Sequence, residues 1–185
     1  MKMCRTMMYF NVLILFVLSI SGTSAQQDPT LFKLLPESKT GIAFNNQLFE
    51  NDTLNILNQA NIYNGGGVGM GDFNQDGLID IYFAGNMVSS KLYLNKGKMQ
   101  FEDITQVANV NGHDRWITGV SVVDINADGL PDIYLSASFR SDPLGRTNLL
   151  YINQGVNKKG IPIFKESAVA YGLADNGYST QAYFL

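Results

Sequence analysis

The chain has 185 residues and a formal net charge of −3, with one cysteine and one histidine. This length suits a single domain or a small set of repeats. Acidic and basic residues are nearly balanced, and no basic patch or stripe is present, so the composition gives no support for nucleic-acid binding. One cysteine alone cannot form an internal disulfide bond.

The first 25 residues have the organisation of a secretory signal peptide. Lys2 and Arg5 give a basic start, an apolar run follows over residues 9–20, and residues 23–25 offer small side chains for cleavage. The apolar run is shorter than the roughly 20 residues that a bilayer requires, which favours cleavage over an uncleaved anchor helix. We therefore expect a protein exported by the Sec route, secreted, periplasmic or at the cell surface, with no transmembrane span after cleavage.

The remaining residues contain an internal repeat. An N-terminal segment, residues 26–64, precedes one repeat at residues 65–112 and another at residues 113–175, and a third begins at residues 176–185. Each full repeat has four short apolar segments bounded by Gly, Asn or Asp, which is typical of strands. They lie at 67–71, 79–84, 91–95 and 100–104 in one repeat, and at 119–123, 133–136, 148–153 and 163–167 in the next.

Four-stranded repeats of this length are the unit of a β-propeller. We predict an all-β fold, an incomplete propeller of about two blades of four antiparallel strands plus partial blades. Residues 32–41 are similar to the end of a blade and are expected to contain a strand that closes the ring. Residues 179–185 are similar to the first strand of a third repeat. The chain is therefore expected to be the N-terminal part of a longer protein.

Each full repeat has a nine-residue acidic loop between its first two predicted strands. Oxygen-bearing side chains occupy positions one, three, five and nine, glycine occupies position six, and position seven would contribute its backbone carbonyl. These are the ligands that Ca²⁺ prefers. The side chain at position seven is then free to point into a core. The predicted ligands are Asp72, Asn74, Asp76, Leu78 and Asp80, then Asp124, Asn126, Asp128, Leu130 and Asp132.

Two alternatives to a propeller-type calcium loop can be weighed from the sequence. An EF-hand requires a glutamate at position twelve and flanking helices. This chain has Phe83 and Leu135 at that position, within β-branched and aromatic segments, so the EF-hand is rejected. The other alternative is a pair of turns that bind nothing, because Asp, Asn and Gly favour turns for backbone reasons alone. Two matched copies favour metal binding.

On these loops and the strands around them, the chain resembles the FG-GAP or VCBS-type repeat family, the calcium-loop propellers that also form the head of integrin α subunits. The core of the resemblance is Asp-x-Asn-x-Asp-Gly-x-x-Asp followed by an aromatic strand, present twice. The surrounding residues are similar to the bacterial secreted branch related to cartilage acidic protein, in which an ASPIC/UnbV segment often follows. The resemblance covers residues 31–185. It implies a β-propeller with Ca²⁺ in its inter-strand loops and a role in binding or adhesion.

The sequence predicts no catalytic residues. His113 stands alone between the repeats, and no serine lies in a G-x-S-x-G elbow. Arg115 and Trp116 are candidates for a ligand surface, although packing between blades is the favoured role for Trp116. We expect a non-catalytic module that binds an extracellular protein or carbohydrate. Two alternatives remain: a scaffold part of a larger carbohydrate-active enzyme whose active site lies beyond residue 185, and a structural protein of the cell envelope.

Overall fold

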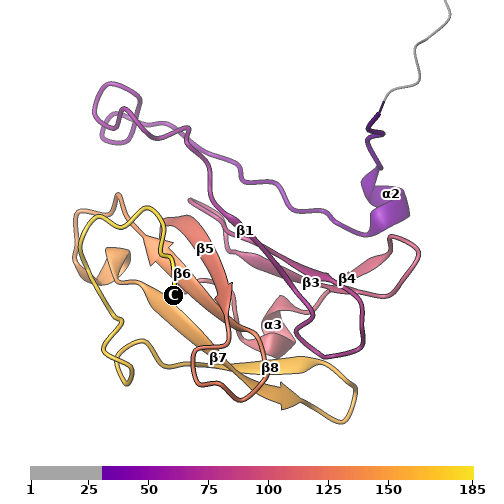
Figure 1. Ribbon diagram of the computed structural model, residues 1–185. Coiled ribbons are helices and arrows are strands. Elements are labelled where there is room, and N and C mark those ends of the chain that lie inside the picture. Colours follow the sequence, from indigo (N-terminus) through magenta and orange to yellow (C-terminus); the bar gives the residue numbers. More distant parts are fainter. Residues whose placement is uncertain (1–30) are drawn as a thin grey trace, which may run out of the picture. The chain divides into compact units, whose positions relative to one another are not determined.

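The computed structural model describes residues 31–185, and residues 35–185 form one compact unit. This unit contains two four-stranded antiparallel sheets, each with its strands in chain order (Figure 1). The strands of one sheet are β1 (Val68–Gly71), β2 (Asp80–Phe83), β3 (Lys91–Asn95) and β4 (Phe101–Asp103). Those of the other are β5 (Ile117–Val123), β6 (Asp132–Ala137), β7 (Leu149–Val156) and β8 (Pro162–Glu166). All eight lie where the sequence predicts strands, which confirms the all-β fold with two four-stranded blades. The predicted signal peptide, residues 1–25, lies outside the described residues.

Three short helical segments accompany the strands: α2 (Glu37–Thr40), α3 (Thr105–Ala108) and the 3₁₀ turn η1 (Leu144–Arg146). Both α2 and α3 end at a residue in the left-handed conformation, Gly41 and Asn109. This shared ending supports the similarity of residues 32–41 to the end of a blade. The strand expected within that segment is not formed: residues 33–36 have no regular structure, and Leu34 is 94% exposed. A strand needs a neighbour for its backbone hydrogen bonds, and this segment pairs with no strand of the described sheets.

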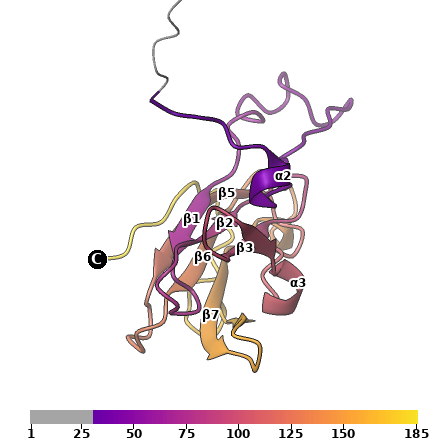
Figure 2. The ribbon, with the colours of Figure 1, turned by 90° about the vertical axis from the view of Figure 1, so that its right-hand side faces the viewer.

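Glycine in β1 allows the two sheets to approach each other, and β1 lies beside β5 (Figure 2). A Cβ atom on Gly69 would lie 2.7 Å from Cγ1 of Val120 and 3.0 Å from Cγ2 of Val122. Carbon atoms without a bond between them prefer about 3.5–4.0 Å, so any larger residue would push the blades apart. The arrangement recurs at Gly119, where a Cβ atom would meet the carbonyl oxygen of Thr180. Residues near Thr180 therefore pack as closely against β5 as β5 packs against β1.

The main hydrophobic core lies between the two sheets and takes side chains from both. Tyr82 and Leu92 come from one sheet, Leu135 and Tyr151 come from the other, and all four are fully buried. Apolar area removed from water contributes about 25 cal/mol per Å² to folding, so this shared core is what holds the blades together. Neither blade buries its inner face without the other.

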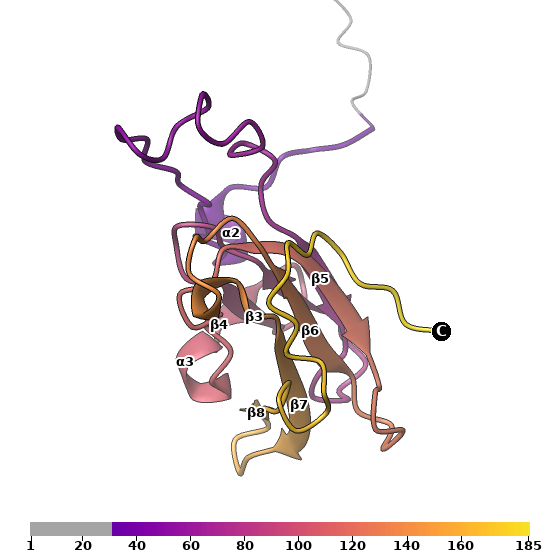
Figure 3. The ribbon, with the colours of Figure 1, turned by 90° about the vertical axis from the view of Figure 1, so that its left-hand side faces the viewer.

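The outer face of the second sheet is covered by the C-terminal segment, which crosses it in Figure 3. The ring of Phe184 meets that of Tyr134 edge-on at 5.4 Å, and the hydroxyl of Ser121 donates a hydrogen bond of 2.6 Å to the carbonyl of Ala182. Residues 179–185 thus run along β5, held by side chains rather than by a backbone ladder. That they form the first strand of a third blade stays a prediction.

Candidate metal-binding loops

The first acidic loop, residues 72–80, joins β1 to β2 and is closed by its own side chains. The two carboxylate oxygens of Asp72 accept backbone hydrogen bonds of 3.0 Å from Asp76 and 2.8 Å from Gly77. The carboxylate of Asp76 accepts a bond of 2.9 Å from the backbone of Leu78 and one of 3.0 Å from the side-chain amide of Asn74. The oxygen-bearing residues at positions one, three and five are therefore linked through one hydrogen-bonded turn.

The second loop, residues 124–132, joins β5 to β6 and repeats these bonds at the same positions. Asp124 accepts backbone hydrogen bonds of 3.1 Å from Asp128 and 2.8 Å from Gly129. Asp128 accepts one of 2.8 Å from the backbone of Leu130 and one of 2.8 Å from the side-chain amide of Asn126. Two segments with different neighbours in sequence have folded into one hydrogen-bonding pattern.

The backbone conformations of the loops agree as closely as their hydrogen bonds. Position four is left-handed in both, with φ of 59° at Gln75 and 58° at Ala127. Position six is left-handed as well, with φ of 84° at Gly77 and 86° at Gly129. Glycine adopts such a φ without steric cost, which accounts for its presence at position six in both loops.

Asp80, the ninth residue of the first loop, ties the loop to its blade. Its side chain is fully buried and accepts backbone hydrogen bonds of 3.0 Å from Phe73 and 2.8 Å from Asn95. Burial raises the pKa of Asp80 to about 6, and the neighbouring carboxylates of Asp76 and Asp72 add to the rise, while the two backbone donors oppose it. Burial and carboxylate repulsion thus outweigh two favourable hydrogen bonds.

Asp132 has the same role in the second loop. It is fully buried and accepts backbone hydrogen bonds of 3.0 Å from Ile125 and 2.7 Å from Asn153. Burial raises its pKa above the usual value, and the carboxylates of Asp128 and Asp124 contribute in the same direction. The electrostatic setting of the loops is therefore repeated along with their geometry.

The side chain that enters the core comes from position two of the loop, not from position seven. Phe73 is fully buried, and its ring meets that of Phe164 edge-on at 5.8 Å. Leu78, at position seven, is 37% exposed, so the expectation that it points into a core is wrong. Phe73 continues the inward alternation of β1 set by Gly69 and Gly71, whereas Leu78 lies on the outer turn of the loop. Among the described residues no group donates a hydrogen bond to the carbonyl oxygen of Leu78, which leaves that oxygen available as a ligand.

Two asparagines that brace the loops were missed by the sequence reasoning. The side-chain amide of Asn95, at the end of β3, donates a hydrogen bond of 2.9 Å to the carbonyl of Ile79. That of Asn153, in β7, donates bonds of 3.2 Å to Pro131 and 2.9 Å to Phe73 in the other blade. The sequence contains the signal, because the two residues end the matching segments Leu-Tyr-Leu-Asn and Leu-Tyr-Ile-Asn, each followed two positions later by glycine.

The two loops lie side by side at one end of the strands, the lower end in Figure 1. The side-chain amide of Gln75 donates a hydrogen bond of 2.9 Å to the carbonyl of Gly129 in the second loop. Asn74 also donates to the carbonyl of Gly160, at 3.4 Å, in the hairpin between β7 and β8. The first loop is thus in contact with the second blade at two exposed points.

The donor set of each loop consists of three carboxylates, one amide and one backbone carbonyl, all hard oxygen ligands of the kind that Ca²⁺ prefers. Within residues 31–185 no three carboxylate, imidazole or thiol groups form a ready-made metal cluster. In each loop two of the three carboxylates have both oxygens bonded to backbone N–H groups, and an asparagine occupies position three, where an aspartate would add charge. The chemistry of the donor set fits calcium, and the ten ligands stay a prediction.

Two face-to-face antiparallel meanders, each with an acidic loop between its first two strands, define a module of the β-propeller type. Residues 72–135, from the start of the first loop into β6, match the family model of the FG-GAP-like repeat. This part of the chain is an FG-GAP-like repeat, which confirms the resemblance at the level of that family. Its narrower assignment to a bacterial secreted branch stays a prediction. A search of curated proteins gives no match. In residues 31–185 the structure contains no helix with the length and apolar character to cross a membrane.

Proposed function

We propose that this chain is a calcium-binding module of an exported β-propeller protein, and that it binds an extracellular protein or carbohydrate without catalysing a reaction. The observation that supports the calcium assignment is the agreement between the two loops in hydrogen bonds and backbone angles. A plain turn needs a glycine and one or two capping oxygens. It does not need three carboxylates, and each of these loops has three.

The ion would be held by the side chains at positions one, three, five and nine and by the carbonyl at position seven. These positions are Asp72, Asn74, Asp76, Asp80 and Leu78 in one loop, and Asp124, Asn126, Asp128, Asp132 and Leu130 in the other. Calcium would supply two positive charges that offset the repulsion among the carboxylates. The raised pKa values of Asp80 and Asp132 have part of their cause in that repulsion, so a cation nearby would favour their charged forms.

Modest affinity is expected for these loops. Asparagine at position three keeps an oxygen donor but lowers the charge of the site, and the loops lie at the protein surface. Calcium modules that work outside the cell bind with Kd of about 10⁻⁴–10⁻³ M, because calcium is abundant there. An affinity in that range fits an exported protein and does not suit a calcium sensor.

The hydrogen bonding of the carboxylates favours a structural role over catalysis. Asp72 and Asp80 each direct both oxygens at backbone N–H groups, and Asp124 and Asp132 do the same in the second loop. A general acid or base needs a carboxylate that reaches a substrate proton. Carboxylates that accept two backbone hydrogen bonds instead fix the loop and its strands in position. The extracellular ligand would then bind to another surface of the blades.

Calorimetric titration of the purified chain with Ca²⁺, and with Mg²⁺ for comparison, tests this proposal. We expect about two calcium ions per chain and much weaker binding of Mg²⁺, which demands a regular octahedral site. Asp76→Asn and Asp128→Asn should each remove one site, and the double variant should remove both. Asp52→Asn, an exposed aspartate outside the loops, should leave both sites intact. Absence of calcium binding in a chain with a normal circular dichroism spectrum would contradict the metal assignment.

A further inference from the structure

A hollow of about 650 Å³ lies at the end of the strands opposite to the acidic loops. It is formed by the β2–β3 loop, the connection between β4 and β5, the residues after β6, and the segment 51–59. Small-molecule sites have volumes of about 300–1,000 Å³ and combine apolar surface with a few convergent polar groups. The hollow has the volume for a ligand of two or three sugar rings, and its lining combines apolar and polar side chains.

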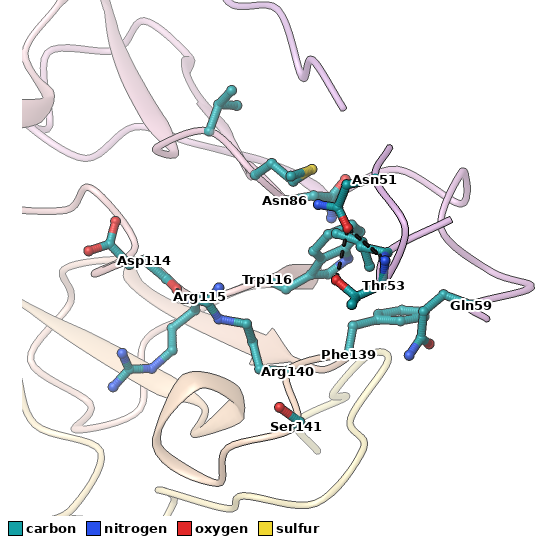
Figure 4. A pocket seen from close by; sticks show the side chains of 13 residues that line it. Asn51, Thr53, Gln59, Asn86, Asp114, Arg115, Trp116, Phe139, Arg140 and Ser141 are labelled. Atoms are coloured by element: carbon teal, nitrogen blue, oxygen red, sulfur yellow. Dashed lines mark hydrogen bonds between the residues drawn. The ribbon is translucent and has the colours of Figure 1, made fainter. Parts of the chain in front are cut away.

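One wall of the hollow is aromatic. The rings of Trp116 and Phe139 lie 5.4 Å apart, and Trp116 is only 5% exposed, so it packs between segments as the sequence predicts. Phe139 is less buried and lies beside it at the hollow. Figure 4 shows the two rings on the side nearest Thr53 and Gln59, with the charged groups on the opposite side. Aromatic faces of this kind pack well against the C–H groups of a sugar ring.

The backbone around the hollow is left-handed at three residues, of which Phe139 is the strained one. Phe139 has a φ of 62°, Asp114 a φ of 57°, and His113, next to Asp114, a φ of 45°. A positive φ is uncommon for residues other than glycine, and for a bulky residue such as phenylalanine it is an outlier. Such conformations persist where the surrounding structure enforces them, and they concentrate at ligand sites. Nothing in the blade repeat demands a phenylalanine in this conformation two residues after the end of β6.

The opposite wall has two arginines, Arg115 and Arg140, and one carboxylate, that of Asp114, so its net charge is positive. Arg140 donates a hydrogen bond of 3.2 Å to the backbone carbonyl of Asp114, and Arg115 also donates to backbone carbonyls. Neither guanidinium is in an ion pair with a carboxylate of residues 31–185. A guanidinium bound only to carbonyls keeps its charge and further N–H groups for a carboxylate, which it recognises in a bidentate geometry.

Amide side chains complete the lining. Asn51 accepts hydrogen bonds from the backbones of Thr53 and Leu54 through its oxygen, which leaves its NH₂ group free of partners among the described residues. The amide of Gln59, on the same segment, also lines the hollow. Amides donate and accept at once, so they suit hydroxyl groups, which do the same.

We propose that this hollow binds an acidic saccharide. Arg140 would bind the carboxylate, the ring of Phe139, supported from behind by Trp116, would pack against a sugar ring, and Asn51 and Gln59 would bind hydroxyl groups. This inference rests on the proposed binding function and gives it a ligand class and a site, but it does not depend on calcium. An acidic peptide would satisfy the arginine and pair its backbone with the amides, but it lacks the flat C–H face of a sugar ring that the aromatic wall accepts, so the saccharide is the better fit.

Trp116 is the single tryptophan of the chain, so its fluorescence reports on this hollow directly. The probe is trigalacturonate, with its neutral methyl ester as the matched saccharide and triglutamate as the matched polyanion. We expect a saturable change in fluorescence with trigalacturonate, at least tenfold weaker binding of the ester, and weaker binding of triglutamate. Arg140→Gln should weaken trigalacturonate binding about tenfold. Lys158→Gln, which removes the same charge from the hairpin at the other end of the strands, should change it less than twofold.

Phe139→Gly separates binding from folding, because glycine accepts the positive φ but has no ring. Binding should be lost while the melting temperature changes little. Three results would overturn the proposal. Trigalacturonate binding that Arg140→Gln does not change would place the saccharide elsewhere and leave the binding function intact. Equal binding of triglutamate would show a site for charge alone. No trigalacturonate binding in a chain that still takes up two calcium ions would reject the saccharide and leave the calcium loops in place.

Discussion

The side-chain amide of Gln75 donates a hydrogen bond of 2.9 Å to the backbone carbonyl of Gly129, and so fastens the first acidic loop to the second. Neither residue is among the predicted metal ligands. A second link lies beneath it, where the buried amide of Asn153 reaches the carbonyl of Phe73 at 2.9 Å. The two loops are therefore parts of one hydrogen-bonded end of the module, and each loop influences the conformation of the other.

Replacing Gln75 by alanine should weaken calcium binding at the first loop without unfolding it. Alanine fits the backbone, because Ala127 occupies the equivalent position with a φ of 58°. Loss of one hydrogen bond costs about 0.5–1.5 kcal/mol, which is at most about a tenfold loss in affinity. The measurement is a calcium titration in an Asp128→Asn background, where only the first loop binds. Gln47→Ala, an exposed control, should have no effect, and an unchanged affinity in Gln75→Ala would show that the loops are independent.

Asn153 and Asn95 occupy matching positions but should differ in their contribution to stability. Asn153 is 1% exposed and its amide bonds to both blades, whereas Asn95 bonds to Ile79 within its own blade. Truncation of Asn153 to alanine leaves buried carbonyl groups without a hydrogen-bond donor. Truncation of Asn95 leaves a carbonyl group that water can reach. We expect Asn153→Ala to lower the free energy of unfolding by about 2–3 kcal/mol and Asn95→Ala by about 1 kcal/mol. Urea unfolding measures both, and equal losses would show that the contact between blades contributes little.

Gly69→Ala tests how closely the blades pack. The added methyl group would lie 2.7 Å from Cγ1 of Val120, a contact that can be relieved only by moving a strand or a side chain. Overpacking of this kind typically costs about 1–3 kcal/mol. Val120→Ala in the same chain should restore part of that loss, because it removes the atom that the methyl group meets. If the double variant is as unstable as the sum of the two single variants, direct contact between β1 and β5 is not the cause.

Without divalent cations, the free energy of unfolding should increase as the pH falls. A carboxylate whose pKa is lowered by folding has the opposite effect. The pKa of Asp80 is about 6 in the folded chain against a usual value of 3.8, and that of Asp132 is raised as well. Between these values the folded state binds more protons than the unfolded state, so the free energy of unfolding should rise as pH falls from about 7 to about 5. With calcium bound the ion favours the charged carboxylates, and the stabilisation by calcium should decline over the same range.

Urea unfolding in metal-free buffer at pH 7.5 and at pH 5.5 gives the comparison. Asp80→Asn should reduce the difference between the two conditions without abolishing it, since Asp132 still titrates. A free energy of unfolding that falls between pH 7.5 and pH 5.5, by the same amount in both chains, would contradict the assignment of the effect to Asp80.

The local signals in the sequence predicted the blades and the loops well, because both depend on short patterns. β-branched and aromatic segments bounded by turn residues gave all eight strands, and the repeated Asp, Asn and Gly positions gave two loops with matching hydrogen bonds. Strand pairing in an antiparallel meander joins neighbours in the sequence, so these patterns determine the topology as well. The FG-GAP-like repeat match over residues 72–135 has the same basis.

The features that were missed depend on contacts between distant residues. Leu78 was expected to point into a core, but the alternation continued from β1 places Phe73 there instead, against Phe164 in the other blade. The bond from Asn153 to Phe73 joins residues 80 positions apart. The strand expected near Leu34 depends on a neighbouring strand that residues 35–185 do not provide. Local patterns specify an element, and only the packed structure specifies its partner.

Dependence of unfolding on calcium tests the central claim most directly. Urea unfolding of the chain should be followed in calcium and in chelator, beside Asp76→Ala/Asp128→Ala and the control Asp52→Ala. Calcium at about 100 times its Kd stabilises a folded chain by about 2.7 kcal/mol per site, so two loops should raise the free energy of unfolding by about 5 kcal/mol. The double variant should lose this gain and the control should keep it. Identical unfolding curves in calcium and in chelator, from a chain with a normal β-sheet spectrum, would contradict the account and leave the two loops as turns.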